Sequence, residues 1–221
     1  MINILEDYIW RSLPDCGGFT TNQSLRKKVD EDGRFLPFGG NTTVFLLNDQ
    51  IKQKLQYLQQ ELHDAAGWML AQPLDPSTFH MTLHDLANGP EGDMDLAERM
   101  ADAGRKATAL LLQWEGRPPL RMHTTWMFNM VNTSIVLGLA PADEDSWQRL
   151  DEMYCALESV VHLGYGLTPH ITLAYYRPGS YSQQELDVLK RALHPVEMDV
   201  ELRMEDLVYQ IFRDMNHYES G

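Results

Sequence analysis

The sequence predicts an α+β fold: a duplicated, bilobal body in which two antiparallel sheets, flanked by helices, surround a central cleft. Strand-like and helix-like segments alternate along the chain, this alternation occurs twice, and the pattern His-x-Thr-Leu occupies the same place in each copy. A chain of 221 residues is long enough for one large domain or two small ones. Its 43% of hydrophobic residues, aromatics included, can form a core.

The first copy covers approximately residues 41–130. It opens with Asn41–Leu47, whose β-branched and apolar residues predict a strand. A helix is predicted next, because apolar residues recur at spacings of four, three and four: Ile51, Leu55, Leu58 and Leu62. A loop with proline leads to a second short strand, Phe79–His84. A further apolar stripe predicts a helix over residues 96–114, and a strand is predicted over Leu120–Met130.

The second copy covers approximately residues 131–221 and repeats this order. Its first strand, Asn132–Gly138, resembles Asn41–Leu47, and a helical stripe follows: Trp147, Leu150, Tyr154, Leu157 and Val161. His170 lies 38 positions after Asn132, and His80 lies 39 positions after Asn41. The last helix opens with the capping-box pattern Ser182-Gln-Gln-Glu185, and strands are predicted over 196–203 and 207–212. The chain is therefore read as one duplication.

Residues 1–40 lie outside the repeat and form an N-terminal arm to the bilobal domain of residues 41–221. Ile2–Leu13 has the composition of a short helix, and residues 14–40 are rich in Gly, Asp and Lys and predict an irregular path. The basic run Arg26-Lys27-Lys28 is interpreted as a solvated loop. Two alternatives stay open for the arm: it covers a cleft, or it wraps the surface.

Charge and composition limit the partners. Eighteen Lys and Arg residues against 32 Asp and Glu residues give a net charge of −14. The charge disfavours long nucleic acid as a partner, because backbone binding requires neutralising many phosphates, whereas one small phosphorylated ligand fits a local pocket. No apolar run approaches the ~18 residues of a membrane span. Two cysteines and an acidic start without the features of a secretory signal lead us to expect a cytoplasmic protein, with a monomer as the simplest state.

The two His-x-Thr-Leu segments carry the candidate chemistry. Residues i and i+2 of a strand lie on one face, so His80 points the same way as Thr82, and His170 the same way as Thr172. If the lobes are related by a pseudo-twofold axis, both pairs can face one ligand. A neutral imidazole then takes a proton from water, a protonated one gives a proton to a departing ribose oxygen, and the hydroxyls donate to phosphoryl oxygens. We assign these four residues as catalytic, with no metal and no other cofactor.

Two such motifs, about 90 residues apart on predicted strands of a duplicated unit, resemble the two-histidine (2H) phosphoesterase superfamily. That group includes 2′,3′-cyclic nucleotide phosphodiesterases and bacterial 2′-5′ RNA ligase-like proteins. The resemblance covers roughly residues 41–215, and the two tetrapeptides are its specific part. It implies a bilobal fold with a central cleft, metal-independent chemistry, and a 2′,3′-cyclic phosphate or related nucleotide phosphodiester as substrate. The acidic balance favours a small nucleotide over a long RNA.

Four neighbouring residues are candidate substrate-binding groups. Strict alternation places His84 on the face of His80, and Tyr176 on the face of His170. His84 then bonds a phosphate or sugar hydroxyl, or it is a strand-end histidine bonded to backbone. Tyr176 stacks on a base, or it is a rim aromatic. Asn41 and Asn132 begin the repeated strands and are either an amide pair beside the cleft or turn residues.

Three functions stay open. The first is a metal-independent cyclic-phosphate phosphodiesterase, the second a non-catalytic nucleotide-binding module, and the third an RNA end-processing, 2′-5′ ligase-like enzyme. A metal site built on His80 and His84 is disfavoured, because a strand separates residues at that spacing by ~13 Å. The direction of chemistry, and which histidine is base or acid, do not follow from the sequence.

Overall fold

The computed structural model describes residues 13–221, and the predicted helix Ile2–Leu13 therefore lies almost entirely outside the described residues. Up to residue 130, the described chain contains β1 (Phe19–Thr20), β2 (Phe38–Leu46), α2 (Asp49–Ala66), β3 (His80–Pro90), α3 (Leu96–Trp114) and β4 (Leu120–Met130). The C-terminal part contains β5 (Ser134–Pro141), α4 (Glu144–Glu158), β6 (His170–Tyr175), β7 (Ser180–Tyr181), α5 (Gln183–Ala192), β8 (Asp199–Leu202), β9 (Leu207–Asp214) and β10 (His217–Ser220).

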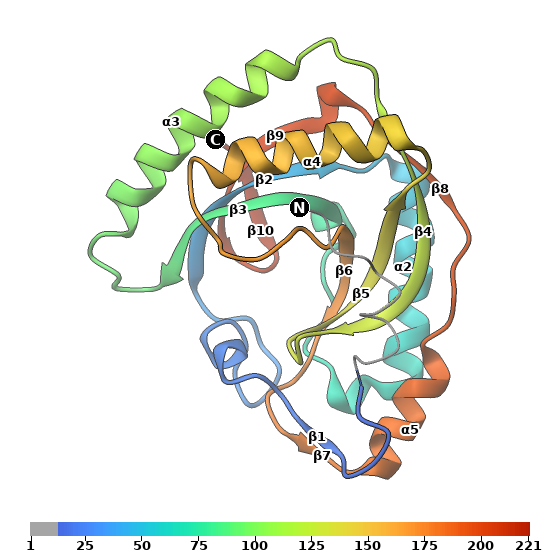
Figure 1. Cartoon of the computed structure of the whole chain (residues 1–221). Helices are drawn as coiled ribbons and strands as arrows, with labels where there is room; N and C mark the ends of the chain where they lie inside the picture. The colour runs from blue at the N-terminus through green and yellow to red at the C-terminus, as the bar shows by residue number, and fades with distance from the viewer. Residues whose placement is uncertain (1–12) are drawn as a thin grey trace.

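The predicted α+β fold with antiparallel sheets is confirmed. Eight strands form one curled sheet in the order β10-β9-β2-β3-β6-β5-β4-β8, and β1 pairs with β7 in a separate ribbon (Figure 1). The eight strands fall into two antiparallel halves of four, which join where β3 meets β6. At that join only Met81 and Ile171 are paired. A narrow seam between two half-sheets leaves room for a cleft on one side.

The sheet order interleaves the two copies of the sequence repeat. β9, from the end of the chain, pairs with β2, whereas β4, from the middle, pairs with β5 and β8. The sequence repeat divides the chain near residue 130. The half-sheets do not follow this division, because each combines strands from both sides of residue 130. β10 has no counterpart among the predicted strands, and β3 runs six residues beyond the predicted Phe79–His84.

The predicted helices form with their apolar stripes inward. In α2, Leu55 and Leu62 are fully buried, and Asn48 caps the first turn by accepting a hydrogen bond from the Ile51 N–H. The capping box of α5 is confirmed, with Ser182 and Glu185 bonded in both directions. Trp147, near the start of α4, departs from its predicted stripe and is exposed, whereas Leu150, Tyr154 and Leu157 of the same stripe are buried. The described residues contain no helix with the length and apolarity needed to cross a membrane.

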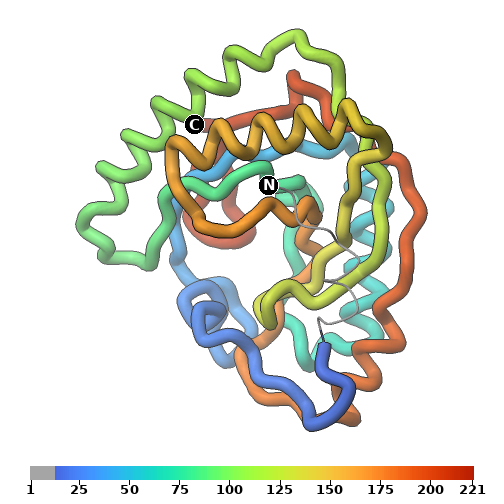
Figure 2. Tube along the Cα trace, viewed as in Figure 1, coloured from blue at the N-terminus to red at the C-terminus, as the bar shows by residue number. Residues whose placement is uncertain are grey.

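Residues 14–40 run past the end of the sheet where β4 turns into β5 and where β6 ends (Figure 2). The Thr21 N–H donates to Gly179 O, and the Asn22 N–H donates to Asn132 O. Leu25 and Val29 are buried in the main core. The arm is therefore anchored along its described length, and its path brings Lys28 to the cavity described below.

Candidate functional site

A cavity of about 610 Å³ opens against the seam between β3 and β6. Both His-x-Thr motifs line it, together with the loop before β6 and the β9–β10 hairpin. This volume lies in the range of typical small-ligand pockets. The intervening motif residues Met81 and Ile171 are fully buried on the opposite face of the sheet. The alternation predicted for the two motifs is thus present in both strands.

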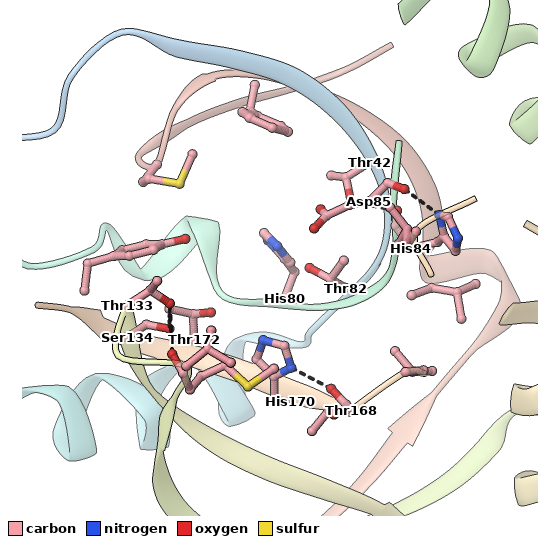
Figure 3. Close-up of a pocket in the computed structure, with 18 of the residues that line it drawn as sticks. Thr42, His80, Thr82, His84, Asp85, Thr133, Ser134, Thr168, His170 and Thr172 are labelled. Carbon is pink, nitrogen blue, oxygen red and sulfur yellow. Dashed lines mark hydrogen bonds between the residues drawn. The ribbon is translucent and has the colours of Figure 1, made fainter. Parts of the chain in front are cut away.

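The strand register brings the two motifs together. β3 and β6 are antiparallel, and Met81 pairs with Ile171. One residue to either side, the same register sets His80 beside Thr172 and Thr82 beside His170. Cross-strand neighbours of this kind have Cβ atoms about 4.5–5.5 Å apart. A local twofold axis through the Met81–Ile171 pair thus relates two His–Thr sets that face one space (Figure 3).

Each motif histidine is oriented by a carbonyl two residues before it. His170 Nδ1 lies 2.6 Å from Thr168 O, and the His80 ring bonds the carbonyl of Thr78. A carbonyl only accepts, so the bonded ring nitrogen carries a hydrogen. In the neutral ring the other nitrogen then holds a free lone pair, as a general base requires. The shared arrangement fixes the tautomer of both histidines.

Burial makes both motif histidines weak bases. It lowers the pKa of His80 to about 4 and lowers the pKa of His170 below its ordinary 6.5. The Thr78 or Thr168 carbonyl and the charge of Asp85 partly oppose this effect. Both imidazoles are therefore neutral at neutral pH in the free protein.

A second pair of hydroxyls comes from the neighbouring strands. Val44 pairs with Thr82, and Val136 pairs with Thr172, which makes Val44 and Val136 equivalent. By the same register Thr42 corresponds to Ser134, and both line the cavity. The two halves thus present matched polar groups at four places on the cavity wall: Thr78 and Thr168, His80 and His170, Thr82 and Thr172, and Thr42 and Ser134.

Both motif strands contain a β-bulge directly after the motif. Between Thr82 and His84 the strand advances two residues while β2 advances one, and β6 does the same between Thr172 and Ala174. A bulge of this kind reverses the faces of all residues beyond it. Asp85 and Tyr175 consequently line the cavity. Strict alternation assigns these two places to His84 and Tyr176 and therefore misses Asp85 and Tyr175; His84 borders the cavity, whereas Tyr176 does not.

His84 is held in the protein interior. Its side chain is fully buried, Nδ1 lies 2.5 Å from Asp85 O, and Nε2 lies 3.2 Å from the carboxylate of Glu158. Both ring nitrogens are therefore occupied, although the residue borders the cavity wall. This matches the alternative of a strand-end histidine bonded to backbone rather than a group that binds substrate.

Tyr176 lies away from the cavity. It is fully buried, its ring packs edge-on against Phe19 at 5.1 Å, and its N–H donates to Thr133 O. The residue before it, Tyr175, occupies the cavity wall instead.

The structure brings neither Asn41 nor Asn132 to the cavity. Asn41 is fully buried: its amide donates to Met100 O and Tyr209 Oη and accepts from the Ala87 N–H. Asn132 adopts φ of +59° in the β4–β5 turn and donates to Thr20 O in the arm. Their equivalence in the sequence does not hold either, since the strand register makes Asn41 correspond to Thr133.

Several cavity residues escaped the sequence reasoning, among them four with charged or aromatic side chains. Asp85 and Tyr175 reach the cavity wall only because of the bulges, which alternation along the strand does not reveal. Lys28 was interpreted as a solvated loop residue, yet its ammonium lies 4.9 Å from the Phe38 ring centre and 6.0 Å from that of Tyr175. Tyr218, on the unpredicted β10, lies edge-on to the His80 ring at 5.0 Å.

Across residues 13–221, no three His, Cys, Asp or Glu side chains cluster in a way that suits a metal ion. Cys16 and Cys155 are both exposed, and neither lines the cavity. The chemistry available at this site is that of imidazoles, hydroxyls, one carboxylate and one ammonium.

Comparison with known proteins identifies the fold. No family model and no curated protein matches the chain. A conserved protein of unknown function from Agrobacterium tumefaciens superposes with a TM-score of 0.66 at 18% identity, covering 92% of this chain and 93% of that one. E. coli LigT complexed with 3′-AMP gives 0.54 at 11%, covering 83% and 95%. TT0787 of Thermus thermophilus gives 0.53 at 14%, covering 82% and 94%.

These likenesses confirm the fold that the sequence motifs imply. The chain has the fold of E. coli LigT and of TT0787, in agreement with the fold that the resemblance to the two-histidine phosphoesterases implies. At these identities the likeness shows the fold alone.

Proposed function

We propose that the protein is a metal-independent phosphodiesterase of the two-histidine type. Its substrate would be a 2′,3′-cyclic phosphate or a similar small nucleotide phosphodiester. One observation carries the proposal: the antiparallel register across the Met81–Ile171 pair sets both His-x-Thr motifs around one cavity. His80, Thr82, His170 and Thr172 keep the catalytic roles that the motifs suggest.

The proposed reaction needs only proton transfers and one exchange at phosphorus. One imidazole accepts a proton from water through its free ring nitrogen, and the water oxygen bonds to phosphorus. The bond from phosphorus to one ribose oxygen breaks, and the other imidazole, in its protonated form, donates its proton to that oxygen. The hydroxyls of Thr82 and Thr172 donate to the non-bridging phosphoryl oxygens, which remain charged throughout. The product is a nucleotide with one phosphate monoester.

Substrate binding supplies the required protonation state. In the free protein burial keeps both imidazoles neutral. A bound phosphodiester carries a negative charge, which favours the charged form of a neighbouring imidazole. One histidine then takes up a proton as the ligand binds, while repulsion keeps the second neutral. The substrate therefore helps to form the acid–base pair that acts on it.

Cavity size and charge favour a small substrate. A volume of about 610 Å³ suits a nucleotide, and the net charge of −14 opposes a long polyanion. The complex of E. coli LigT with 3′-AMP, in a protein of the same fold, is consistent with a ligand of this size. A monomeric protein of the cytoplasm remains part of the proposal.

A turnover screen over 2′,3′-cyclic mononucleotides, with and without EDTA, tests the proposal. We expect hydrolysis that EDTA leaves unchanged and that His80→Ala or His170→Ala removes. Activity lost in EDTA and restored by zinc would contradict the metal-independent chemistry. Tight nucleotide binding without turnover would instead indicate a binding module. A steep fall in oligonucleotide affinity with added salt would indicate an RNA-processing enzyme.

A further inference from the structure

Two opposite charges lie in the cavity beyond the paired motifs. Lys28 comes from the arm and Asp85 from β3 past the bulge. Burial lowers the pKa of the Lys28 ammonium, and the charge of Asp85 partly opposes that effect, so the two groups lie within electrostatic range. Yet within residues 13–221 neither group forms an ion pair or a side-chain hydrogen bond with the other or with any further residue. A ligand can therefore be bound by both.

Aromatic rings fix the position of Lys28. Its Nζ lies 4.9 Å from the centre of the Phe38 ring and 6.0 Å from that of Tyr175. Cation–π contacts of this length hold the flexible side chain in one place. Tyr175 itself packs edge-on against Phe35, at 5.8 Å between ring centres. The ammonium is thus held against the Phe38 and Tyr175 rings, of which the Tyr175 ring lines the cavity.

The buried His84 network fixes the position of Asp85. His84 Nδ1 bonds the carbonyl of Asp85, and His84 Nε2 is anchored by Glu158 on α4. On the other side, Asp85 pairs with Thr42 of β2. The carboxylate consequently projects into the cavity from a restrained backbone (Figure 3). His84 therefore acts as a positioning residue for Asp85.

The pair of charges matches a nucleobase better than a second phosphate. A phosphate would gain from Lys28 but would be repelled by Asp85. A neutral ring with both donors and acceptors on its edge satisfies both groups, and its face can stack on Tyr175. Among the common bases, guanine offers two adjacent N–H donors to the two oxygens of a carboxylate and a carbonyl oxygen to an ammonium. Such bidentate bonds to a charged acceptor are strong and geometrically specific.

We propose that Lys28 and Asp85 form a base-recognition subsite that selects guanine in the substrate nucleotide. The subsite extends the proposed function, because it assumes that the cavity binds nucleotides. It also gives the arm a role: residues 14–40 supply one of the two recognition groups. Of the two alternatives left open for the arm, this favours the one in which it covers the cleft.

Binding of 3′-mononucleotides, measured by calorimetry, tests the subsite without requiring turnover. The unmodified protein should bind 3′-GMP about 10- to 100-fold more tightly than 3′-AMP, the range expected of one good bidentate contact. Asp85→Asn replaces one acceptor with a donor and should bring that ratio close to one. Lys28→Met keeps the apolar stem against the rings and should weaken 3′-GMP more than 3′-AMP. Lys27→Met, at the exposed neighbouring position, is the matched control and should change neither affinity.

The outcomes separate the subsite from the catalytic proposal. Equal affinity for 3′-GMP and 3′-AMP in the unmodified protein, or an equal change of both in Asp85→Asn, would overturn the subsite even if cyclic phosphates are hydrolysed. A guanine preference that depends on Asp85, without turnover of any cyclic phosphate, would support the subsite and contradict the hydrolase. We expect Asp85→Asn and Lys28→Met to fold, since neither substitution removes a hydrogen bond within the described residues. Thermal melting of each variant checks this.

Discussion

The two halves of the cavity wall agree at four positions and differ at the fifth. Strands β3 and β6 each present a histidine and a threonine, each bulges after the motif, and each is flanked by hydroxyls of equivalent origin. Past the bulge, Asp85 in one half corresponds to Tyr175 in the other. The matched groups suit a phosphate, whose oxygens are alike on both sides. The unmatched groups suit the part of a ligand that has no such symmetry.

The matched groups can perform the chemistry, whereas the unmatched groups can recognise the substrate. A twofold arrangement of imidazoles and hydroxyls can take a proton on one side of a phosphorus atom and give one on the other. It cannot distinguish one nucleotide from another, because every phosphodiester presents the same oxygens. The nucleotide must therefore be recognised where the two halves differ, by Asp85 and Tyr175 and by Lys28 from the arm.

Removal of either imidazole should have the largest effect and tests whether the matched histidines are equally required. His80→Ala and His170→Ala should each reduce kcat for a 2′,3′-cyclic nucleotide by about 10²–10⁴-fold, the usual contribution of a positioned acid or base. Steady-state kinetics with a check of thermal melting measures this. Loss in one variant alone would show that only one motif is catalytic.

Replacement of the motif hydroxyls should have the next largest effect. Thr82→Val and Thr172→Val preserve the β-branched shape but remove the donor to the phosphoryl oxygen. Each should lower kcat by about 10²-fold, as loss of one donor to a developing charge typically does. The two variants should match one another within a few-fold. Variants with normal kcat and raised KM would instead assign these threonines to ground-state binding.

The pH dependence of kcat/KM follows from the burial of the histidines. Catalysis needs one neutral and one protonated imidazole, and burial lowers the pKa of His80 to about 4 and that of His170 below 6.5. The singly protonated free protein therefore becomes scarce as pH rises above about 6.5. We expect kcat/KM to fall about tenfold per pH unit from there upward. A value that increases between about pH 6 and about pH 8 would contradict the assignment.

The smallest expected effect concerns Glu158, which helps to position Asp85 through its hydrogen bond with His84. Glu158 bonds His84, His162 and the Leu163 N–H, and so joins α4 to the loop before β6. Glu158→Gln should cost about 1 kcal/mol of unfolding free energy, since the amide keeps one acceptor oxygen but loses the charge that strengthens the hydrogen bonds from His84 and the Leu163 N–H. Denaturant unfolding measures the cost. Glu152→Gln, on the exposed side of the same helix, is the control and should stay within about 0.5 kcal/mol.

The sequence predicts the fold and the motif residues because both depend on the spacing of residues along the chain. Apolar stripes locate the helices around Leu55 and Leu150, and the repeated His-x-Thr motif locates the strands that meet at Met81 and Ile171. The catalytic role of the motif residues remains a prediction until turnover is measured.

What escapes the sequence depends on local register and on distant packing. One extra residue after each motif turns His84 inward and exposes Asp85, and alternation alone contains no sign of that bulge. Lys28 reaches the cavity only because the buried Leu25 and Val29 anchor the arm beside it. The strand register relates the two copies by an offset one residue larger than the offset between Asn41 and Asn132 in the sequence. These two residues therefore do not occupy equivalent places in the fold.

The central claim is that both motifs bind a single anion, and NMR titration of the two imidazoles with a 3′-mononucleotide tests it most directly. The side-chain nitrogen signals of His80 and His170 should shift together, with one shared Kd and one equivalent of ligand at saturation. Only one of the two rings should gain a proton. A shift confined to one histidine, or two shifts with different affinities, would contradict the account.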